Sequence, residues 1–286
     1  MALRTRLTRA APALTPPRRP RLRAAGRRWL VFAAALVVWQ FAVRLAPQDL
    51  RPYFPPPTSI AEHMYRLWLT GPPGHLFLTP VATGQVLPSL GRMAAGWALA
   101  VMCGVAVGLA LGRSERARDI VEPMTHFFRT LPPPALIPIF IIIFKLTDVM
   151  RIAVIAFGVV WPVVMNTIDG ARSADPLLID TARVFGLGRA RRLWSLILPS
   201  AAPKIFAGLR ISLSMALILM VVSETIGGFN GIGYTLFHSE QAFLITDMWA
   251  WIALLGVLGY GLNAALLVLE RRLLAWHRAA HDEQGT

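Results

Sequence analysis

The sequence contains little charge, almost no lysine and a single cysteine. Only 15% of its 286 residues are charged, whereas a soluble domain carries roughly 25%. The one cysteine, Cys103, lies within an apolar run, so the chain forms no intrachain disulfide. Hydrophobic residues make up 55% of the chain and gather in long runs. This composition indicates a membrane protein.

Motifs for catalysis and metal binding are also missing. A P-loop needs glycine immediately before its lysine, but the two lysines, Lys145 and Lys204, follow phenylalanine and proline. No G-x-S-x-G or G-x-G-x-x-G pattern occurs. His277 and His281 are four residues apart in a polar tail, without the glutamate of an HExxH motif. We therefore predict no catalytic residue, no metal ligand and no enzyme activity in this chain.

Six apolar stretches are long enough, or nearly so, to cross a hydrocarbon core of about 30 Å, which takes roughly 20 helical residues. They are residues 29–45, 93–111, 124–144, 152–168, 205–226 and 248–269. We expect an all-α integral membrane protein with about six transmembrane helices. No small-x-small cleavage pattern follows the first stretch, so we expect it to be a span and not a signal peptide.

The arginines indicate the orientation. With the N-terminus inside, the inner segments carry 21 basic residues and the outer segments carry six. Cytoplasmic loops show this excess, so we expect both termini in the cytoplasm. The same asymmetry accounts for the net charge of +14 without nucleic-acid binding. The basic tail 1–28 lacks apolar periodicity, and we expect it to be disordered or bound to the membrane surface.

The second stretch carries a small residue at every fourth position, which predicts a seam for close helix packing. The residues are Gly96, Ala100, Gly104, Gly108 and Gly112. Glycine is also frequent in membrane helices generally, which is the alternative interpretation.

The third stretch contains Pro132–Pro134, which remove amide donors and clash with preceding carbonyls. Broken backbone in a membrane is tolerated where it is buried in protein or lines a cavity. This favours a place near a transport pathway over a kinked helix that only packs. Arg129 and Arg210 lie near the inner ends of their stretches, so we expect both to reach the headgroups. Glu224 lies at the outer end, so we expect no Arg129–Glu224 pair.

The outer segment 47–87 is predicted to contain a short helix that begins with a Ser59–Glu62 capping box. It lies either on the outer membrane surface or against the spans. Its apolar face consists of Ile60, Met64, Leu67 and Trp68.

The inner loop 169–204 is predicted to form a helix, a glycine break and a second helix. Asp175 and Pro176 are typical of a helix start. One face of the first helix is apolar and lacks basic residues at its edge, which favours a protein partner. Arginines open the second helix, so it alternatively lies on the bilayer. The apolar face contains Leu177, Leu178, Thr181, Val184 and Phe185.

This loop resembles the signature E-A-A-x3-G-x9-I-x-L-P of permeases of binding-protein-dependent ABC importers. The corresponding residues are Asp180, Thr181, Ala182, Gly186, Leu196, Leu198 and Pro199. Asp180, Thr181 and Leu196 depart from the signature, and the other four match. The resemblance implies that segment 175–199 docks into a groove on a separate ATPase subunit and transmits its closure.

Residues 30–275 resemble the nitrate/sulfonate/taurine-type branch of that family. The matching pieces are Pro55–Ile60, Arg129 with Pro132, Ala135 and Pro138, Asn166–Thr167 with Gly170, Gly208–Arg210, and Glu224 with Gly231, Gly233 and Tyr234. Lys145 stands where the branch has glycine. It is either a lysine that reaches the headgroups or a residue that alters substrate preference.

The resemblance implies a type I ABC importer permease fold in a bacterial inner membrane. It implies a tail 1–28, a permease domain 29–275 and a tail 276–286. The expected partners are a second copy, ABC ATPase subunits that bind ATP and Mg, an extracytoplasmic solute-binding protein and membrane lipid. The solute implied is a small anion such as a sulfonate, taurine or nitrate.

Substrate contacts are expected from the third to fifth spans of a pathway that alternates its access between the two sides. The candidates are Arg129, Pro132, Asn166, Ser212, Ser214, Ser223 and Glu224. A secondary carrier or channel would need internal repeats or an ion relay, and neither is found. A membrane scaffold that uses the loop only to recruit a partner is the other alternative.

Overall fold

The computed structural model describes residues 21–75 and 77–274, which contain helices and no strand. The chain divides into two compact units at Pro57/Thr58. The first unit contains α1, Arg21–Leu45, and a 3-10 turn, Arg51–Tyr53. The Arg51 side chain donates hydrogen bonds to the carbonyl oxygens of Arg44 and Ala46, both at 2.9 Å, and so caps the end of α1.

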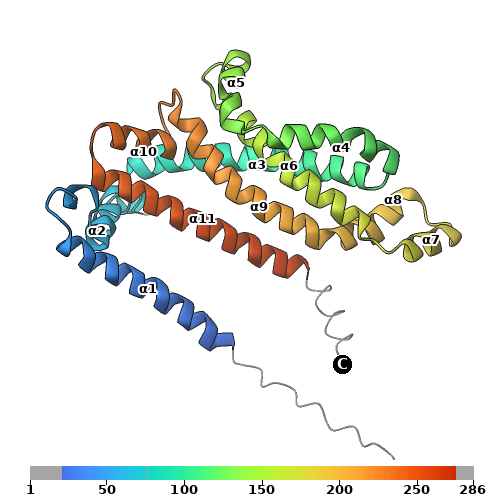
Figure 1. Cartoon of the computed structure of the whole chain (residues 1–286), viewed down its shortest axis with the longest axis horizontal. Coiled ribbons are helices and arrows are strands. Elements are labelled where there is room, and N and C mark those ends of the chain that lie inside the picture. Colours follow the sequence, from blue (N-terminus) through green and yellow to red (C-terminus); the bar gives the residue numbers. More distant parts are fainter. Residues whose placement is uncertain (1–20, 76, 275–286) are drawn as a thin grey trace, which may run out of the picture. The chain divides into compact units, whose positions relative to one another are not determined.

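The second unit consists of ten helices among its described residues. They are α2 Pro57–Trp68, α3 Leu87–Gly112, α4 Glu115–Thr130, α5 Ile137–Phe144, α6 Asp148–Arg172, α7 Pro176–Val184, α8 Arg189–Arg192, α9 Leu198–Thr225, α10 Ile232–Gln241 and α11 Ile245–Leu273. In Figure 1, α6 lies between α3 and α9, and α11 runs along α9.

The predicted helical membrane fold is confirmed, with corrections to the spans. Four helices are long and apolar enough to cross a membrane, namely 82–112, 148–172, 189–225 and 245–273. A bent pair of helices counts as a fifth, and the apolar part of α1, Trp29–Leu45, is shorter. Helix α1 begins at Arg21, inside the segment expected to be disordered or bound to the membrane surface. Residues 1–20 and the tail 276–286, with its two histidines, lie outside the described residues.

The predicted span over residues 124–144 is not one continuous helix, because α4 ends at Thr130 and the chain turns by 87°. Leu131 is extended, with ψ of 123°, as is Pro132, with ψ of 117°. Each precedes a proline, and the ring of the following proline disfavours helical ψ. A 3-10 turn, Pro133–Leu136, then leads into α5.

Two other prolines are accommodated inside continuous helices. Helix α3 follows a π-helical turn, Ala82–Val86, and α9 follows another, Leu193–Ile197. Both turns precede a Leu-Pro pair, Leu87–Pro88 and Leu198–Pro199. The wider turn moves the preceding carbonyls away from the proline ring, so the helix continues.

The glycine seam on α3 is confirmed, and its partner is α6. A Cβ added at Gly104 would lie 2.8 Å from a methyl carbon of Val163, and one at Gly108 would lie 2.5 Å from the Cβ of Thr167. Helix α6 uses other glycines, including Gly158, to approach α9. Helices α3, α6 and α9 therefore form one closely packed layer.

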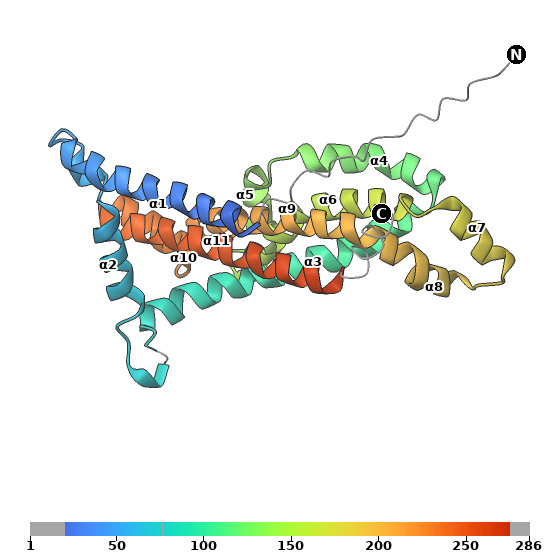
Figure 2. The same ribbon diagram turned by 90° about the horizontal axis from the view of Figure 1, so that it is seen from below.

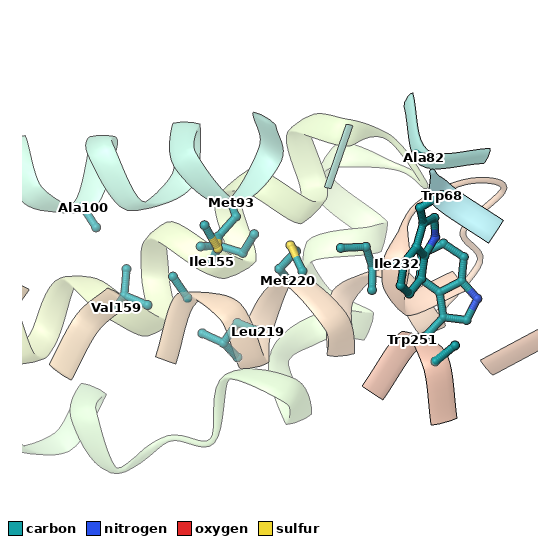
Figure 3. Close-up of a cluster of buried hydrophobic side chains, with 12 residues drawn as sticks. Trp68, Ala82, Met93, Ala100, Ile155, Val159, Leu219, Met220, Ile232 and Trp251 are labelled. Carbon is teal, nitrogen blue, oxygen red and sulfur yellow. The ribbon is translucent and has the colours of Figure 1, made fainter. Parts of the chain in front are cut away.

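The largest buried cluster extends from the end of this layer that carries α2 and α10 to the middle of α3, α6 and α9. Figure 3 shows Trp68 of α2 against Trp251 of α11, with ring centroids 5.2 Å apart. Ile155 and Met220 lie in the same cluster and are fully buried. Of the two predicted places for α2, the structure therefore shows packing on the spans.

The predicted capping box of α2 is wrong. The helix begins at Pro57, two residues before Ser59. Glu62 instead forms an exposed ion pair with Arg66, one helical turn further on.

Candidate functional site

The predicted coupling segment forms a helix with defined ends. The Asp175 carboxylate accepts a hydrogen bond from the Leu177 amide at 2.9 Å, and Pro176 occupies the first helical position of α7. At the other end, the amides of Gly186 and Leu187 donate to the carbonyls of Arg183 and Ala182, at 3.0 and 2.9 Å. These two bonds form a Schellman motif.

Gly186 allows this helix end because its φ is +71°, a conformation that side chains disfavour. A Cβ added there would have no atom within 4 Å. The requirement for glycine is therefore conformational and does not come from crowding.

Helix α7 presents different faces to the bundle and to its surroundings. Ala182 is buried, and Ile179 packs on a small cluster formed by Ala171, Ala174 and Ile197. The opposite face is apolar and exposed, with Val184 and Phe185 86% and 78% exposed. Asp180 pairs with Arg183 at 2.8 Å. This exposed apolar face is hereafter called the α7 face and consists of Leu177, Leu178, Val184 and Phe185.

The second helix of the loop is not separate from the fifth span. Helix α8, the π-helical turn and α9 form one continuous helix, Arg189–Thr225, of 37 residues. Leu196, Leu198 and Pro199 are half-buried at the join. The end of the loop is therefore an extension of the longest helix in the described chain.

The pathway candidates do not form one cluster, because no hydrogen bond or ion pair of the described residues joins two of them. Ser212 is buried and accepts a hydrogen bond from the Trp97 indole at 2.9 Å, and Ser223 donates to the Met220 carbonyl. Asn166 donates to the Pro162 carbonyl at 2.8 Å.

The remaining candidates on the third to fifth spans are Arg129, Pro132 and Ser214, and all three are exposed. Arg210 has a partner that the sequence did not predict. Its guanidinium pairs with Glu270 of α11 at 2.5 Å.

Glu224 lies fully buried in a polar cluster that the sequence analysis missed. Its carboxylate accepts hydrogen bonds from the Ser89 hydroxyl and the Arg92 guanidinium, both at 2.8 Å, and from the Gly233 amide at 3.0 Å. Arg92, which directly precedes the expected stretch 93–111, is only 5% exposed. Arg92 lies four residues before Gly96 and so continues the seam of α3. This spacing is the sequence feature from which its place in the helix interface could have been predicted.

The cluster extends to α6 through Asp148. The Asp148 carboxylate lies 2.8 Å from Nε of Arg92 and 2.9 Å from Nη1 of Arg151. Arg151 is also buried and approaches the Gly227 carbonyl at 3.3 Å. Two arginines and two carboxylates thus balance each other and join α3, α6 and α9. We call Arg92, Asp148, Arg151 and Glu224 the charge cluster.

Gly231 allows the loop before α10 to approach this cluster. Its φ is +118°, and a Cβ there would lie 2.4 Å from a Glu224 carboxylate oxygen. Glycine is therefore required at this position for both conformation and space.

The chain resembles known proteins over most of its length. Residues 100–275 match the family described as binding-protein-dependent transport system inner membrane component. The taurine transport system permease protein of Escherichia coli is 34% identical over 86% of this chain and 87% of its own length. A putative aliphatic sulfonates transport permease protein of Bacillus subtilis is 31% identical, covering 87% of each chain. The nitrate import permease protein of Synechocystis is 30% identical, covering 84% and 86%.

A solved structure agrees with the fold. The MetNI methionine ABC transporter, in an inward-facing conformation, superposes with a TM-score of 0.59 at 18% identity, over 66% of this chain and 94% of the other. From these matches and the helical layer described above, the chain belongs to the binding-protein-dependent inner membrane components, the multi-pass permease subunits of ABC importers.

Proposed function

We propose that this permease moves a small anion of the sulfonate, taurine or nitrate kind into the cytoplasm by alternating access. The names of the three relatives described above assign them to the transport of taurine, aliphatic sulfonates and nitrate. The alignment with each relative covers more than four fifths of this chain. A solute-binding protein delivers the solute from outside, and both termini lie in the cytoplasm, as the arginine distribution favours.

The observation that carries this proposal is the α7 face. Its apolar side chains are exposed on a helix whose two ends are fixed by hydrogen bonds. Exposed apolar patches of this kind mark interaction sites. We assign the face to a cytoplasmic ATPase subunit, which binds ATP and Mg, because the segment corresponds to the family signature. The permease itself contributes no ATP hydrolysis.

The continuous helix Arg189–Thr225 suggests how ATPase closure reaches the pathway. A helix of 37 residues is about 55 Å long, so it connects the loop end to the charge cluster at Glu224. Displacement of the loop by the ATPase therefore moves α9 as a rigid element. The two access states differ in free energy when the ATPase binds ATP, which is what drives the switch.

A second copy of the chain is the proposed partner of α9. One stripe of this helix is exposed at every third or fourth residue and is mainly apolar, with one hydroxyl. Such a stripe faces either lipid or another membrane helix. We place the pathway at the interface of two copies, with lipid around them. The residues of the stripe are Ala207, Ile211, Ser214 and Ile218.

ATP-driven uptake in proteoliposomes tests the function. Permease, its ATPase and its binding protein are expected to accumulate labelled taurine, an alkanesulfonate or nitrate only with internal ATP. Uptake that persists without the ATPase would support a secondary carrier or channel. ATPase stimulation without solute movement would support a scaffold.

Replacing Gly186 by valine is expected to weaken ATPase binding and ATP-driven uptake. A residue with a Cβ at φ of +71° costs about 1–2 kcal/mol, which destabilises the Schellman motif beside the α7 face. Gly186→Asn is expected to retain most uptake, because asparagine tolerates this conformation. The measurements are co-purification of the ATPase and uptake rate.

The matched control is Gly188→Ser. Gly188 is the N-cap of α8, its φ is −62°, and a Cβ added there would have no atom within 4 Å. Serine is therefore expected to leave ATPase binding and uptake unchanged. Equal uptake by Gly186→Val and Gly188→Ser would contradict the role of the helix end.

Replacing Phe185 by serine is expected to reduce ATPase association without changing the stability of the permease. Its side chain is 78% exposed, so the folded chain alone loses little packing. Burial of a phenylalanine contributes about 1.5–3 kcal/mol at a partner surface, so the affinity is expected to fall roughly tenfold or more. Phe229→Ser, at an 85% exposed side chain beyond the end of α9, is the control. An unchanged affinity would rule out the α7 face as the docking surface.

A further inference from the structure

A pocket of about 460 Å³ lies at the end of the bundle where α7 projects. Its walls come from the last turns of α3 and α6, the first turn of α4, and the buried side of α7. Figure 2 shows α4, α7 and α8 together at this end of the second unit. The pocket is far from the charge cluster, which lies at the opposite ends of α3, α6 and α9.

The charged side chains in the walls of this pocket are mainly basic. Four arginines line the pocket, and each of the four helices or its cap contributes one of them. Only two carboxylates line it, those of Glu115 and Asp180. Asp180 is already paired with Arg183 at 2.8 Å. The other three arginines are Arg113, Arg118 and Arg172.

Two of these arginines have no acidic partner among the described residues. Arg118 lies 3.0 Å from Asp119, whereas no ion pair of the described chain includes Arg113 or Arg172. Both uncompensated guanidinium groups belong to the lining of the pocket. Glu115 is also outside every ion pair of the described chain, but the four guanidinium groups exceed the two carboxylates, so the lining has a net positive charge.

The surroundings add positive charge to the pocket. Burial lowers the pKa of the Arg113 guanidinium, and the charges of Arg192, Arg183 and Arg189 lower it further. Two guanidinium nitrogens of Arg192, Nε and Nη1, are buried without a hydrogen-bond partner in the described chain. This crowding of like charges is unfavourable as it stands, and an anion bound among them would relieve it.

We propose that this pocket binds a phosphate-bearing anion, either the headgroup of an anionic phospholipid or free phosphate. Guanidinium groups donate paired hydrogen bonds that match phosphate oxygens. The volume is within the usual range for small-ligand pockets. The pocket also lies at the ends of membrane-spanning helices, where basic pockets bind anionic headgroups. With the orientation proposed above, the lipid would come from the cytoplasmic leaflet.

An anion in this pocket would not compete with the proposed ATPase. Helix α7 lines the pocket with Pro176, Ile179, Asp180 and Arg183, whereas the α7 face is on its other side. The ligand would instead connect α7 to the ends of α3 and α6 through Arg113 and Arg172. Its occupancy would therefore stiffen the attachment of the coupling helix.

Lipid retention by the purified full-length chain tests this proposal independently of transport. Wild-type protein is placed in nanodiscs of phosphatidylcholine with or without phosphatidylglycerol, and retained lipid is counted by native mass spectrometry. The variant Arg113→Gln/Arg172→Gln removes the two uncompensated charges. At about 1 kcal/mol for each arginine near anionic lipid, retention of phosphatidylglycerol is expected to fall roughly 10- to 30-fold.

The control Arg116→Gln/Arg191→Gln removes two exposed arginines outside the pocket lining and is expected to retain wild-type binding. The variant Arg113→Lys/Arg172→Lys keeps the charge, and an intermediate loss is expected because lysine lacks the paired donors. This variant decides the test if the glutamine variant does not fold.

Titration with inorganic phosphate in phosphatidylcholine nanodiscs distinguishes the two sources. Saturable phosphate binding that depends on Arg113 and Arg172, without selective retention of phosphatidylglycerol, would assign the pocket to free phosphate. Equal lipid retention by the pocket and control variants, together with no phosphate binding, would overturn the proposal.

Discussion

Replacing Arg92 by alanine is expected to destabilise the folded permease by about 3–5 kcal/mol, because the Glu224 carboxylate would remain buried without its cation. Arg92 is 5% exposed and Glu224 fully buried, so water does not compensate the loss. The Asp148 carboxylate would lose one of its two arginines as well. The free energy of unfolding, measured in mixed micelles with increasing denaturing detergent, checks this expectation.

The double variant Arg92→Met/Glu224→Leu separates charge burial from packing. It removes both charges and is expected to be more stable than Arg92→Ala, since no unpaired ion remains. The exposed pair of α2 supplies the control, because Arg66→Ala is expected to cost at most about 1 kcal/mol. A loss for Arg92→Ala no larger than for Arg66→Ala would show that the charge cluster contributes little to the fold.

Replacing Gly108 by leucine is expected to destabilise the permease by about 3 kcal/mol, the upper end of the range for overpacked interiors. Even a Cβ at this position would lie 2.5 Å from the Thr167 Cβ and 3.0 Å from the Val164 carbonyl oxygen. Helices α3 and α6 must therefore separate to admit the side chain. The same unfolding measurement applies, and ATP-driven uptake is expected to be lost with the packing.

Gly91→Leu on the same helix is the matched control. Gly91 is exposed, and a Cβ there has no atom within 4 Å, so the higher helix propensity of leucine is expected to make it neutral or slightly stabilising. Similar destabilisation by both substitutions would mean that the seam is not closely packed in the membrane.

The sequence predicted features that depend on local spacing. The seam of α3 follows from small residues at every fourth position, and the ends of α7 follow from Asp175, Pro176 and Gly186. The proline run predicted broken backbone, but not the 87° turn, which depends on how α5 packs against α6. The glycines, the prolines and Asp175 act on the backbone close to their own positions in the chain. Their spacing in the sequence was therefore sufficient to predict these features.

Contacts between distant residues could not be predicted in the same way. Arg92 and Glu224 are 132 residues apart, and no local pattern indicates that they pair. The continuity of α8 and α9 was also not predicted, because the sequence analysis treated the second helix of the loop and the stretch 205–226 as separate segments. The π-helical turn before Leu198–Pro199 removes the clash of the proline ring, so the helix continues.

The 87° bend at Pro132–Pro134 has a consequence for the order in which the chain enters the bilayer during synthesis. Helix α5 has eight residues and is about 12 Å long, less than half of the roughly 30 Å hydrocarbon core. Helix α4 is rich in charged side chains, so neither half inserts as an independent span. Stable insertion of this segment therefore waits for α6, the helix onto which Ile137 packs. A ribosome paused before α6 would leave α4 and α5 accessible to water-soluble reagents.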